Sequence, residues 1–582
     1  MSLESNQRSA EFLKISDQFK LGALTTEASH PVTANLSQTA QTDLPQALKL
    51  LFEVDGDVVA RYREFAQSGR AMAIAQTMLT ALTNGGKIFF TGCGSTGRLS
   101  IQLVSIWRDF WQQQAGRGLN CNPSLADLEH RAFAVMAGGD FALIKAVEGF
   151  EDFSEFGKKQ LSDLGVSARD VVFAITEGGE TSFVIGTAWK GVEVGAKVYF
   201  VYNNPDEILR QTVQRSRHVI DDSRIEKINL TTGPMAITGS TRMQATTIQL
   251  CVMLTILEIV VRELMRQLEP TGRLALTSDS VPMGFLNGLE QAQAVLKSPA
   301  FLNQLARLVE LEESAYRAGR KNNYFAARFA IDVLTDTTER SPTYCTPPFR
   351  KFDDATAAES WAFLFVPPNQ TPDAWNYILK RPPACLEWAE ADLQNLVSQD
   401  KLANTRETLR KIRVGELMRF KVGLDGLPFR TLSPGDISVA VISQAERASL
   451  LDPQGFHRMQ LEAAHSHGAR LGLIFFGGSS AIAEVRDFLS AWKIPCEAVL
   501  VPVPETDFLL DGLTRVCVKT VLNSLSTATM VRLGRVMGNY MIWVVPSNLK
   551  LIDRATRYIQ NLTQLNYQKA NELLFEVIEY VA

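Results

Sequence analysis

The first half of the chain alternates short apolar runs with longer stretches in which apolar residues recur every three or four positions. Short apolar runs are typical of buried strands, and the longer period is typical of helices. Their alternation predicts a doubly wound parallel sheet with helices between its strands. The predicted strands are Ile88 to Phe90, Ala132 to Met136, Val171 to Ile175, Val198 to Tyr202 and Lys227 to Asn229, and the apolar helix Gln244 to Leu268 follows them.

The second half repeats this plan, which predicts an internal duplication and an α/β fold class with two such sheets. A chain of 582 residues has room for about three units of ordinary domain size. The predicted strands of the second unit are Phe325 to Ile331, Ala362 to Val366, Ser438 to Ile442, Leu471 to Phe476 and Ala498 to Val503, and the helix Val516 to Met530 closes it.

We expect four segments along the chain. Residues 1–50 precede the first unit and are predicted to form an extended polar arm up to Pro45. The first unit spans residues 51–270 and the second spans 271–530. Residues 531–582 are predicted to form a helical cap, which ends in the amphipathic run Asn561 to Tyr580.

A turn rich in glycine and hydroxyl groups joins the first predicted strand to a helix, within Lys87-Ile-Phe-Phe-Thr-Gly-Cys-Gly-Ser-Thr-Gly-Arg98. Glycines allow the backbone to approach an anion closely, and the first amides and the dipole of the helix favour its charge. Hydroxyl groups add donors at the same place. The predicted phosphate cradle consists of Gly92, Gly94, Ser95, Thr96 and Gly97.

The same turn matches the dinucleotide pattern G-x-G-x-x-G, which alone is a weak signal. A dinucleotide site needs an acidic residue about 20 positions further on, at the end of the second strand. Here the helical run Leu99 to Gln114 fills that interval, so a monophosphate is the better prediction. In the second unit Arg320-Lys-Asn-Asn-Tyr324 stands where we expect the turn, so only one cradle is predicted intact.

A second loop, Ile175-Thr-Glu-Gly-Gly-Glu-Thr181, follows another predicted strand and offers glycines beside hydroxyl groups. Loops at the carboxyl ends of neighbouring parallel strands form the ligand crevice of an open α/β sheet. The alternative is that both loops are simply tight turns. The candidate binding residues of this loop are Thr176, Gly178, Gly179 and Thr181.

Charge and composition exclude several classes of function. Hydrophobic residues make up 46% of the chain and charged residues 21%, with a formal net charge of −4. These values are ordinary for a globular protein and predict neither a nucleic acid nor an anionic membrane as partner. The apolar run Ile248 to Val261 contains Gln249 and Glu258 and is shorter than a membrane span, so we expect a buried helix.

Localisation and cofactors follow from weaker signals. The seven cysteines are scattered singly and the first residues lack the apolar core of a secretory signal, which predicts a cytoplasmic protein. His465 and His467 lie near Glu462, but residues two apart point to different faces of a helix. We therefore expect no metal site, and no cofactor is predicted.

Several motifs together resemble the SIS (sugar isomerase) domain family, and within it the N-acetylmuramic acid 6-phosphate etherases and the glucokinase regulatory proteins. The loop Thr176-Glu-Gly-Gly-Glu-Thr181 resembles the SIS signature, and the resemblance covers nearly the whole chain. The shared stretches are Thr26-Glu-Ala-Ser-His-Pro31, Gly92 to Leu99, Met136-Ala-Gly-Gly-Asp140, Ala146-Val-Glu-Gly-Phe-Glu-Asp152, Gly233-Pro, Thr238-Gly-Ser-Thr-Arg-Met243, Lys519-Thr-Val-Leu-Asn-Ser-Leu-Ser-Thr527, Gly538-Asn and Ser547-Asn-Leu-Lys-Leu551.

The resemblance implies a composite site with two carboxyl groups. In the etherases one glutamate acts as base at C2 of the opened sugar and another helps lactate to leave from C3, after which water adds. Glu151 falls on one of these family positions and is the candidate base. The other position is Ile106 here, but Glu339, in Glu339-Arg-Ser-Pro-Thr-Tyr344, resembles a family glutamate and is the candidate acid. Its alternative is an exposed loop glutamate.

The resemblance also implies phosphate contacts from distant parts of the chain. Lys550 matches a lysine that the regulatory proteins bring to the sugar phosphate, and a point charge suits that role. Ser240, Thr241 and Arg242 are further candidates, although Arg242 is equally open to an internal salt bridge. The departures from the family pattern are Glu177, Gly178, Glu180 and Gln244.

Two functions remain open from the sequence. The first is a binding protein that holds a sugar 6-phosphate between its two units and signals this to a partner such as a sugar kinase. The second is a lyase that releases D-lactate from N-acetylmuramic acid 6-phosphate. An aldose–ketose isomerase or a nicotinamide enzyme is less favoured. The tandem arrangement implies either a monomer that is a pseudo-dimer or a homodimer.

Overall fold

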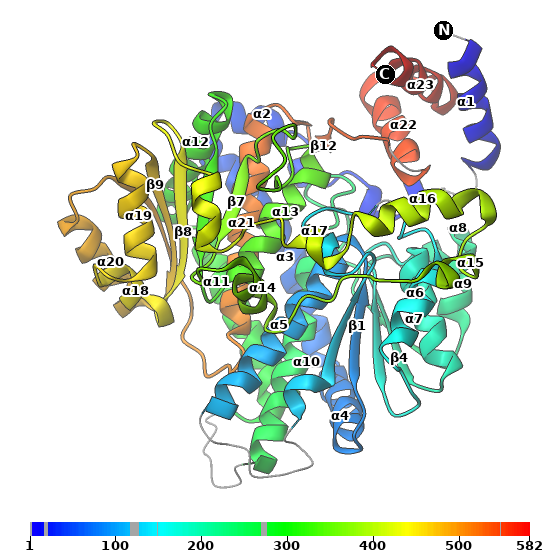
Figure 1. Ribbon diagram of the computed structural model, residues 1–582, viewed down its shortest axis with the longest axis horizontal. Coiled ribbons are helices and arrows are strands. Elements are labelled where there is room, and N and C mark those ends of the chain that lie inside the picture. Colours follow the sequence, from blue (N-terminus) through cyan, green and yellow to red (C-terminus); the bar gives the residue numbers. More distant parts are fainter. Residues whose placement is uncertain are drawn as a thin grey trace.

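The computed structural model describes residues 3–16, 21–116, 127–147, 149–268, 276–546 and 549–581. Its first half contains a five-stranded sheet in which all neighbouring strands are parallel (Figure 1). The strand order is β2-β1-β3-β4-β5, which places the ends of β1 and β3 side by side at the switch point of the sheet. Its strands are β1 Ile88–Gly92, β2 Ala132–Met136, β3 Val171–Ile175, β4 Lys197–Tyr202 and β5 Ile225–Asn229.

The second half contains another parallel five-stranded sheet, of order β10-β9-β8-β6-β7. Taken in chain order, its strands occupy the same relative places as those of the first sheet. The prediction of two doubly wound sheets is therefore confirmed, and the repeated topology supports a duplication. Its strands are β6 Asn322–Ala326, β7 Ala362–Phe365, β8 Ile437–Ser443, β9 Arg470–Gly477 and β10 Cys496–Pro502.

The helices pack the two halves into one apolar core that contains residues of both sheets. Helix α10, which ends the first half, packs against α21 of the second half, and α13 packs against α5. The helices of the first half are α3 Leu44–Gln67, α4 Arg70–Thr83, α5 Gly94–Gly116, α6 Ser154–Asp163, α7 Ser182–Glu193, α8 Asp206–Thr212, α9 Gln214–Asp221 and α10 Gln244–Leu268. Those of the second half are α11 Val281–Leu296, α12 Pro299–Arg317, α13 Ala330–Tyr344, α14 Thr371–Leu379, α15 Glu390–Gln394, α16 Gln399–Arg410, α17 Val414–Leu417, α18 Ala448–Leu451, α19 Phe456–Ser466, α20 Ser479–Ala491 and α21 Gly512–Arg532.

One predicted strand is wrongly placed. The run Phe325 to Ile331, apolar except for Arg328, contains the end of β6, the following turn and the start of α13. A short apolar pattern does not distinguish these elements. The segment Arg320 to Tyr324, which we aligned with the glycine turn, largely belongs to β6 itself. The turn between β6 and α13 is Ala327-Arg-Phe329, which contains no glycine.

The two ends of the chain also differ from expectation. The predicted extended arm is helical, with α1 Leu3–Ile15 and α2 Leu36–Thr42, and α3 continues beyond residue 50. The predicted helical cap begins with a hairpin, β11 Val536–Met537 and β12 Tyr540–Met541. The run Asn561 to Tyr580 is divided between α22 Leu549–Thr563 and α23 Tyr567–Val581. Helices α1, α22 and α23 lie together at one corner of the molecule (Figure 1).

The apolar run Ile248 to Val261 lies inside α10, where all its side chains are buried within the protein. This confirms the prediction of a buried helix. Among the helices of the described ranges, none has the length and apolar character that crossing a membrane requires.

Candidate functional site

The glycine turn between β1 and α5 is held partly by its own side chains. Gly94 has a φ of +57°, a conformation that favours glycine, and a Cβ on Gly92 would lie 2.4 Å from the backbone of Thr96. The Thr96 hydroxyl accepts a hydrogen bond from the Cys93 amide at 3.1 Å and donates to the Cys93 carbonyl at 2.9 Å. Thr96 therefore shapes the turn, while Gly94 and Ser95 are half-buried.

Gly97 has a packing role within the same turn. A Cβ there would lie 2.6 Å from the Met136 side chain, at the end of the neighbouring strand β2. The absence of a side chain at Gly97 thus lets α5 pack close to the sheet, with its first turn at the switch point.

The loop after β3 lies beside this turn because β1 and β3 are neighbours. The hydroxyl oxygens of Thr176 and Thr181 are 3.1 Å apart, and the Gly179 amide donates to Thr176 Oγ1 at 3.3 Å. Gly179 has a φ of +78°, and the Gly178 carbonyl accepts from Asn204 at 3.0 Å. The two loops that we predicted to form one pocket are therefore adjacent, each with an ordered backbone.

Carboxyl groups surround the turn between β1 and α5. Cys93 Sγ lies 3.5 Å from Glu151 Oε2, which places the candidate base against the cradle. Glu177, in the loop after β3, is buried, and this burial raises its pKa from 4.5 to about 7. The negative charge of Glu339 acts in the same direction. Glu177 therefore loses its proton at a higher pH than an exposed glutamate does.

Glu339 reaches this cluster from the second half of the chain. It lies on α13, is buried, and its Oε2 is 3.5 Å from Arg242 Nε. Its charge also acts on Arg98, whose guanidinium donates to Thr338 Oγ1 at 3.2 Å across the interface between the halves. The structure therefore does not place Glu339 in an exposed loop, and the charge of this residue acts on Glu177.

Arg242 forms internal ion pairs. Its guanidinium donates to Asp336 Oδ1 at 2.6 Å and to Ser526 Oγ at 2.9 Å, and it lies over the ring of Tyr344. The sequence left open whether Arg242 contacts phosphate or forms an internal salt bridge. The contacts of its guanidinium are those of an internal salt bridge. Arg242 Nη1 is buried without a hydrogen-bond partner among the described residues.

The neighbouring hydroxyl residues have different roles. Ser240 Oγ is also buried without a partner in the described part of the chain. The Thr241 carbonyl accepts a hydrogen bond from the Thr246 hydroxyl at 2.8 Å. The Thr241 hydroxyl stabilises the Glu177 carboxylate. Thr241 thus lies at the carboxyl cluster, whereas Gln244 donates to Asp55 at 2.7 Å and connects helices outside it.

Lys550, on cap helix α22, lies at the loop after β3. Its Nζ is 2.6 Å from Glu180 Oε1, and Arg215 pairs with the other Glu180 oxygen at 3.0 Å. Burial alone would raise the pKa of Glu180, but these two cations outweigh it and lower the pKa to about 2. Glu180 therefore holds Lys550 at the loop after β3, beside the predicted phosphate cradle. Ser547 and Asn548 of the same motif, and Glu148, lie outside the described residues.

The N-terminal segment and α22 close over this site together. Glu27 pairs with Arg554 at 2.6 Å and with Arg557 at 3.0 Å, so α22 presents a basic face to Glu27 and Glu180. Thr26 exchanges hydrogen bonds with Asn204, which also contacts the loop after β3. The residues that sequence reasoning did not assign to the site are Cys93, Arg98, Arg215 and Glu27, although Glu27 and Arg98 stand within or beside the quoted motifs.

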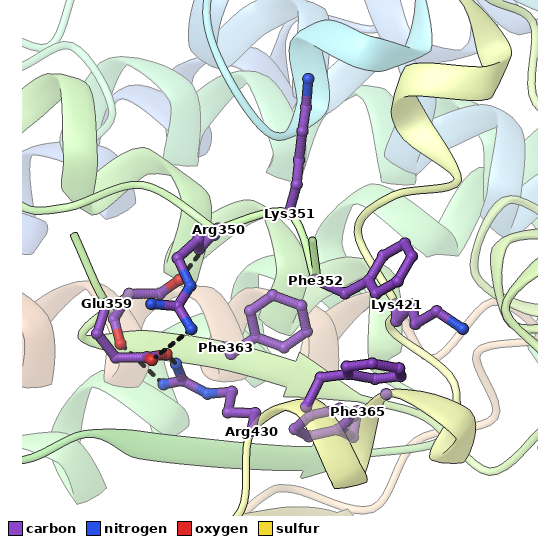
Figure 2. Close-up of a pocket in the computed structure, with 11 residues that line it drawn as sticks. Arg350, Lys351, Phe352, Glu359, Phe363, Phe365, Lys421 and Arg430 are labelled. Atoms are coloured by element: carbon purple, nitrogen blue, oxygen red, sulfur yellow. Dashed lines mark hydrogen bonds and ion pairs between the residues drawn. The ribbon is translucent and has the colours of Figure 1, made fainter. Parts of the chain in front are cut away.

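Another hollow lies along the edge strand β7 of the second sheet, far along the chain from these loops (Figure 2). Arg350 and Arg430 both pair with Glu359 there, and Lys421 pairs with Asp425. The cavity of about 20 Å³ has room for about one water molecule. Because these cations have carboxylate partners and the space is small, we do not assign the sugar-phosphate site to it.

Comparisons with known proteins identify the relatives of this chain. A profile of the glucokinase regulatory protein N-terminal SIS domain matches residues 71–189. An N-acetylmuramic acid 6-phosphate etherase from Thermosynechococcus vestitus is 32% identical over 227 residues, which are 39% of this chain and 64% of that protein. The etherase from Yersinia pestis (strain Pestoides F) is 30% identical over 39% of this chain and 68% of that protein.

The chain thus matches less than two thirds of the length of the Thermosynechococcus relative. A tagatose-6-phosphate ketose/aldose isomerase from Escherichia coli aligns over 83% of this chain and 93% of its own, at 10% identity and a TM-score of 0.39, too low to support a conclusion. The etherase matches, together with the shared loop motifs and the repeated parallel sheets, show that the chain belongs to the SIS-domain family that contains the N-acetylmuramic acid 6-phosphate etherases.

Proposed function

We propose that this protein binds a sugar 6-phosphate at the switch point of the first sheet, beneath α22, and signals its presence to a partner such as a sugar kinase. The observation that carries the proposal is the Lys550–Glu180 pair, in which a cap cation contacts the loop after β3, beside the predicted phosphate cradle. The amides of Gly94 and Ser95 at the start of α5 favour an anion at the same place.

The same pair provides a physical basis for signalling. A bound phosphate competes with Glu180 for Lys550, and Glu180 keeps Arg215 as a partner when it loses the lysine. Because α22 is attached through Lys550, Arg554 and Arg557, a ligand that takes one of these cations changes how the cap is held. Such a ligand shifts the population of cap positions only by its difference in affinity between them.

Binding is tested with fructose 6-phosphate and N-acetylmuramic acid 6-phosphate in calorimetry and thermal unfolding. A ligand at about 100 times its Kd should stabilise the protein by about 2.7 kcal/mol. Lys550→Gln should weaken binding about tenfold or more, since a hydrogen bond to a charged group contributes about 1.5–3 kcal/mol. Lys197→Gln, which removes a partly exposed lysine paired with Glu226, is the matched control. If no sugar phosphate binds, or Lys550→Gln binds as the wild type does, the proposal is wrong.

The second candidate is the lyase, which the carboxyl cluster favours. Glu151 beside Cys93 is the proposed base that removes the C2 proton of the opened sugar. Glu339 is the proposed acid that protonates the departing lactate oxygen, and water then adds across the new double bond. The raised pKa of Glu177, to which the charge of Glu339 contributes, supports acid–base chemistry at this carboxyl cluster.

Lactate release decides between the two candidates. If the protein is a lyase, Glu151→Gln and Glu339→Gln should each lower the rate of D-lactate release from N-acetylmuramic acid 6-phosphate by about 10²–10⁴-fold. Glu155→Gln, an exposed glutamate four residues from the candidate base, should leave the rate unchanged. Binding without any lactate release would reject the lyase and leave the binding proposal standing.

A further inference from the structure

A groove lies where the two halves meet, away from the glycine turn. It is an open cavity of about 460 Å³, which is in the size range of sites for small organic ligands. One wall comes from the second half of α5 and the residues before β2, and the other from α14 and the chain that follows it, which are neighbours in the fold (Figure 1). We call it the junction groove and define it by Arg108, Gln112, His130, Asn376, Tyr377 and Lys380.

Ordered contacts across the interface fix the two walls. Lys380 Nζ is 2.8 Å from Asp109 Oδ1, and Gln112 Nε2 donates to the Lys380 carbonyl at 2.9 Å. Arg381, also at the groove, pairs with Asp140 through both terminal nitrogens and so already has a carboxylate partner. The groove is therefore part of a connected interface, and its lysine and amide donors have defined positions.

Arg108 is the unusual member of this lining. It is only 8% exposed, and its nearest carboxylate oxygen, on Glu129, is 3.7 Å away and already accepts a hydrogen bond from Gln112 at 2.9 Å. Its Nη1 is 3.3 Å from His130 Nδ1, and its Nε has no hydrogen-bond partner among the described residues. Burial lowers the pKa of Arg108, and the neighbouring charge of Arg381 lowers it further. A buried guanidinium in this situation is stabilised by an incoming anion.

We propose that the junction groove binds a small organic phosphate that carries hydroxyl groups, with its phosphate at Arg108 and Lys380. A phosphate offers three acceptor oxygens and up to about two negative charges, which suit a guanidinium and an ammonium together. Lys380 has three donors, of which Asp109 takes one. Glu129 and Asp373 also line the groove, and their oxygens accept from hydroxyl groups of the ligand but repel a second anionic group.

This site is distinct from the sugar-phosphate site and does not depend on it. Helix α5 begins at the glycine turn and reaches Arg108 fourteen residues later, so the two sites are separated by about 20 Å along one helix. The junction groove is lined by the second half of α5 and by α14, whereas the sugar-phosphate site lies beneath α22 at the ends of β1 and β3.

Calorimetric titration with sn-glycerol 3-phosphate tests the proposal. Arg108→Gln and Lys380→Gln should each weaken its binding by about tenfold or more, while Arg108→Lys should weaken it less. Lys550→Gln and Lys197→Gln should leave this binding unchanged. Thermal unfolding without ligand shows whether each variant is folded, and Lys380→Gln, at a partly exposed position, keeps the test decisive if Arg108→Gln unfolds.

Several results would overturn the site. The assignment is wrong if glycerol 3-phosphate does not bind at all, or if it binds Lys380→Gln and Arg108→Lys with unchanged affinity. It is also wrong if binding is lost in Lys550→Gln instead, or if unphosphorylated glycerol binds equally well. Citrate is titrated in the same way to test a ligand that carries carboxylates in place of a phosphate. If citrate binds through Arg108 and glycerol 3-phosphate does not, the assignment to a phosphate is wrong. Because Lys550→Gln addresses only the cradle, failure here and failure of the proposed function are distinguishable.

Discussion

Replacing Asp336 by asparagine should lower the free energy of unfolding by about 3 kcal/mol, because it leaves buried cations without their main carboxylate. Asp336 accepts from Arg242 at 2.6 Å and from Arg340 at 2.9 Å, and all three side chains are almost completely buried. Arg340 retains Glu312 at 3.3 Å and Arg242 retains Glu339 at 3.5 Å, which keeps the expected loss at the lower end of the range for a broken buried pair.

Chemical denaturation of the variant and the wild type measures this loss. Asp353→Asn is the matched control, since Asp353 pairs with Arg419 at the surface and such pairs contribute about 0–1 kcal/mol. The double variant Asp336→Asn with Arg242→Met should recover part of the stability because it also removes one of the uncompensated charges. A single variant as stable as the control would show that this network does not hold the halves together.

Replacing Glu27 by glutamine should release α22 from the body of the protein. Burial alone would raise the pKa of Glu27, but Arg554 and Arg557 lower it from 4.5 to about 2, which corresponds to about 3 kcal/mol. The amides of α22 should then exchange with solvent about a hundredfold faster in the variant, as measured by hydrogen exchange. Glu226→Gln, which removes only a surface pair with Lys197, should leave these rates unchanged.

The effect of Glu27 should also depend on pH in a defined direction. Its pKa is lowered in the folded protein, so its stabilisation is fully present above about pH 4.5 and is lost as the pH falls toward about 2. The difference in α22 opening between wild type and Glu27→Gln should therefore be constant from pH 7 to 5 and shrink below about pH 4.5. A difference that grows on acidification would contradict the assigned ion pairs.

Both sheets could be predicted from the sequence because buried parallel strands are short apolar runs separated by helices. The strand ending at Ala326 was misplaced because Phe325 to Ile331, apolar except for Arg328, contains a strand end, a turn and a helix start. The N-terminal helices were missed because they are stabilised by distant contacts, such as Ser9 with Asn571, and not by their own pattern. The break between α22 and α23 lies at Gln564, which has a φ of +62°. No glycine or proline stands at this position, so the sequence did not indicate the break.

The candidate site was only partly predictable for a similar reason. The glycine and hydroxyl residues of the loops at the ends of β1 and β3 could be recognised in the local sequence. The resemblance to the SIS family led to Glu151, Glu339 and Lys550. The pairing of Lys550 with Glu180 joins residues 370 positions apart, which no local pattern contains. The raised pKa of Glu177 likewise arises from burial by surrounding elements, so it could not be read from the loop itself.

The position of Glu339 on α13 has a consequence for how the pocket behaves in solution. In an assembly of separate subunits, a pocket completed by a neighbouring chain is lost on dilution as the subunits part. Here a covalent connection supplies the contribution of the second half to the first, as the Arg242 and Asp336 contact illustrates. The carboxyl groups that the two halves contribute to the proposed site therefore do not separate when the protein is diluted.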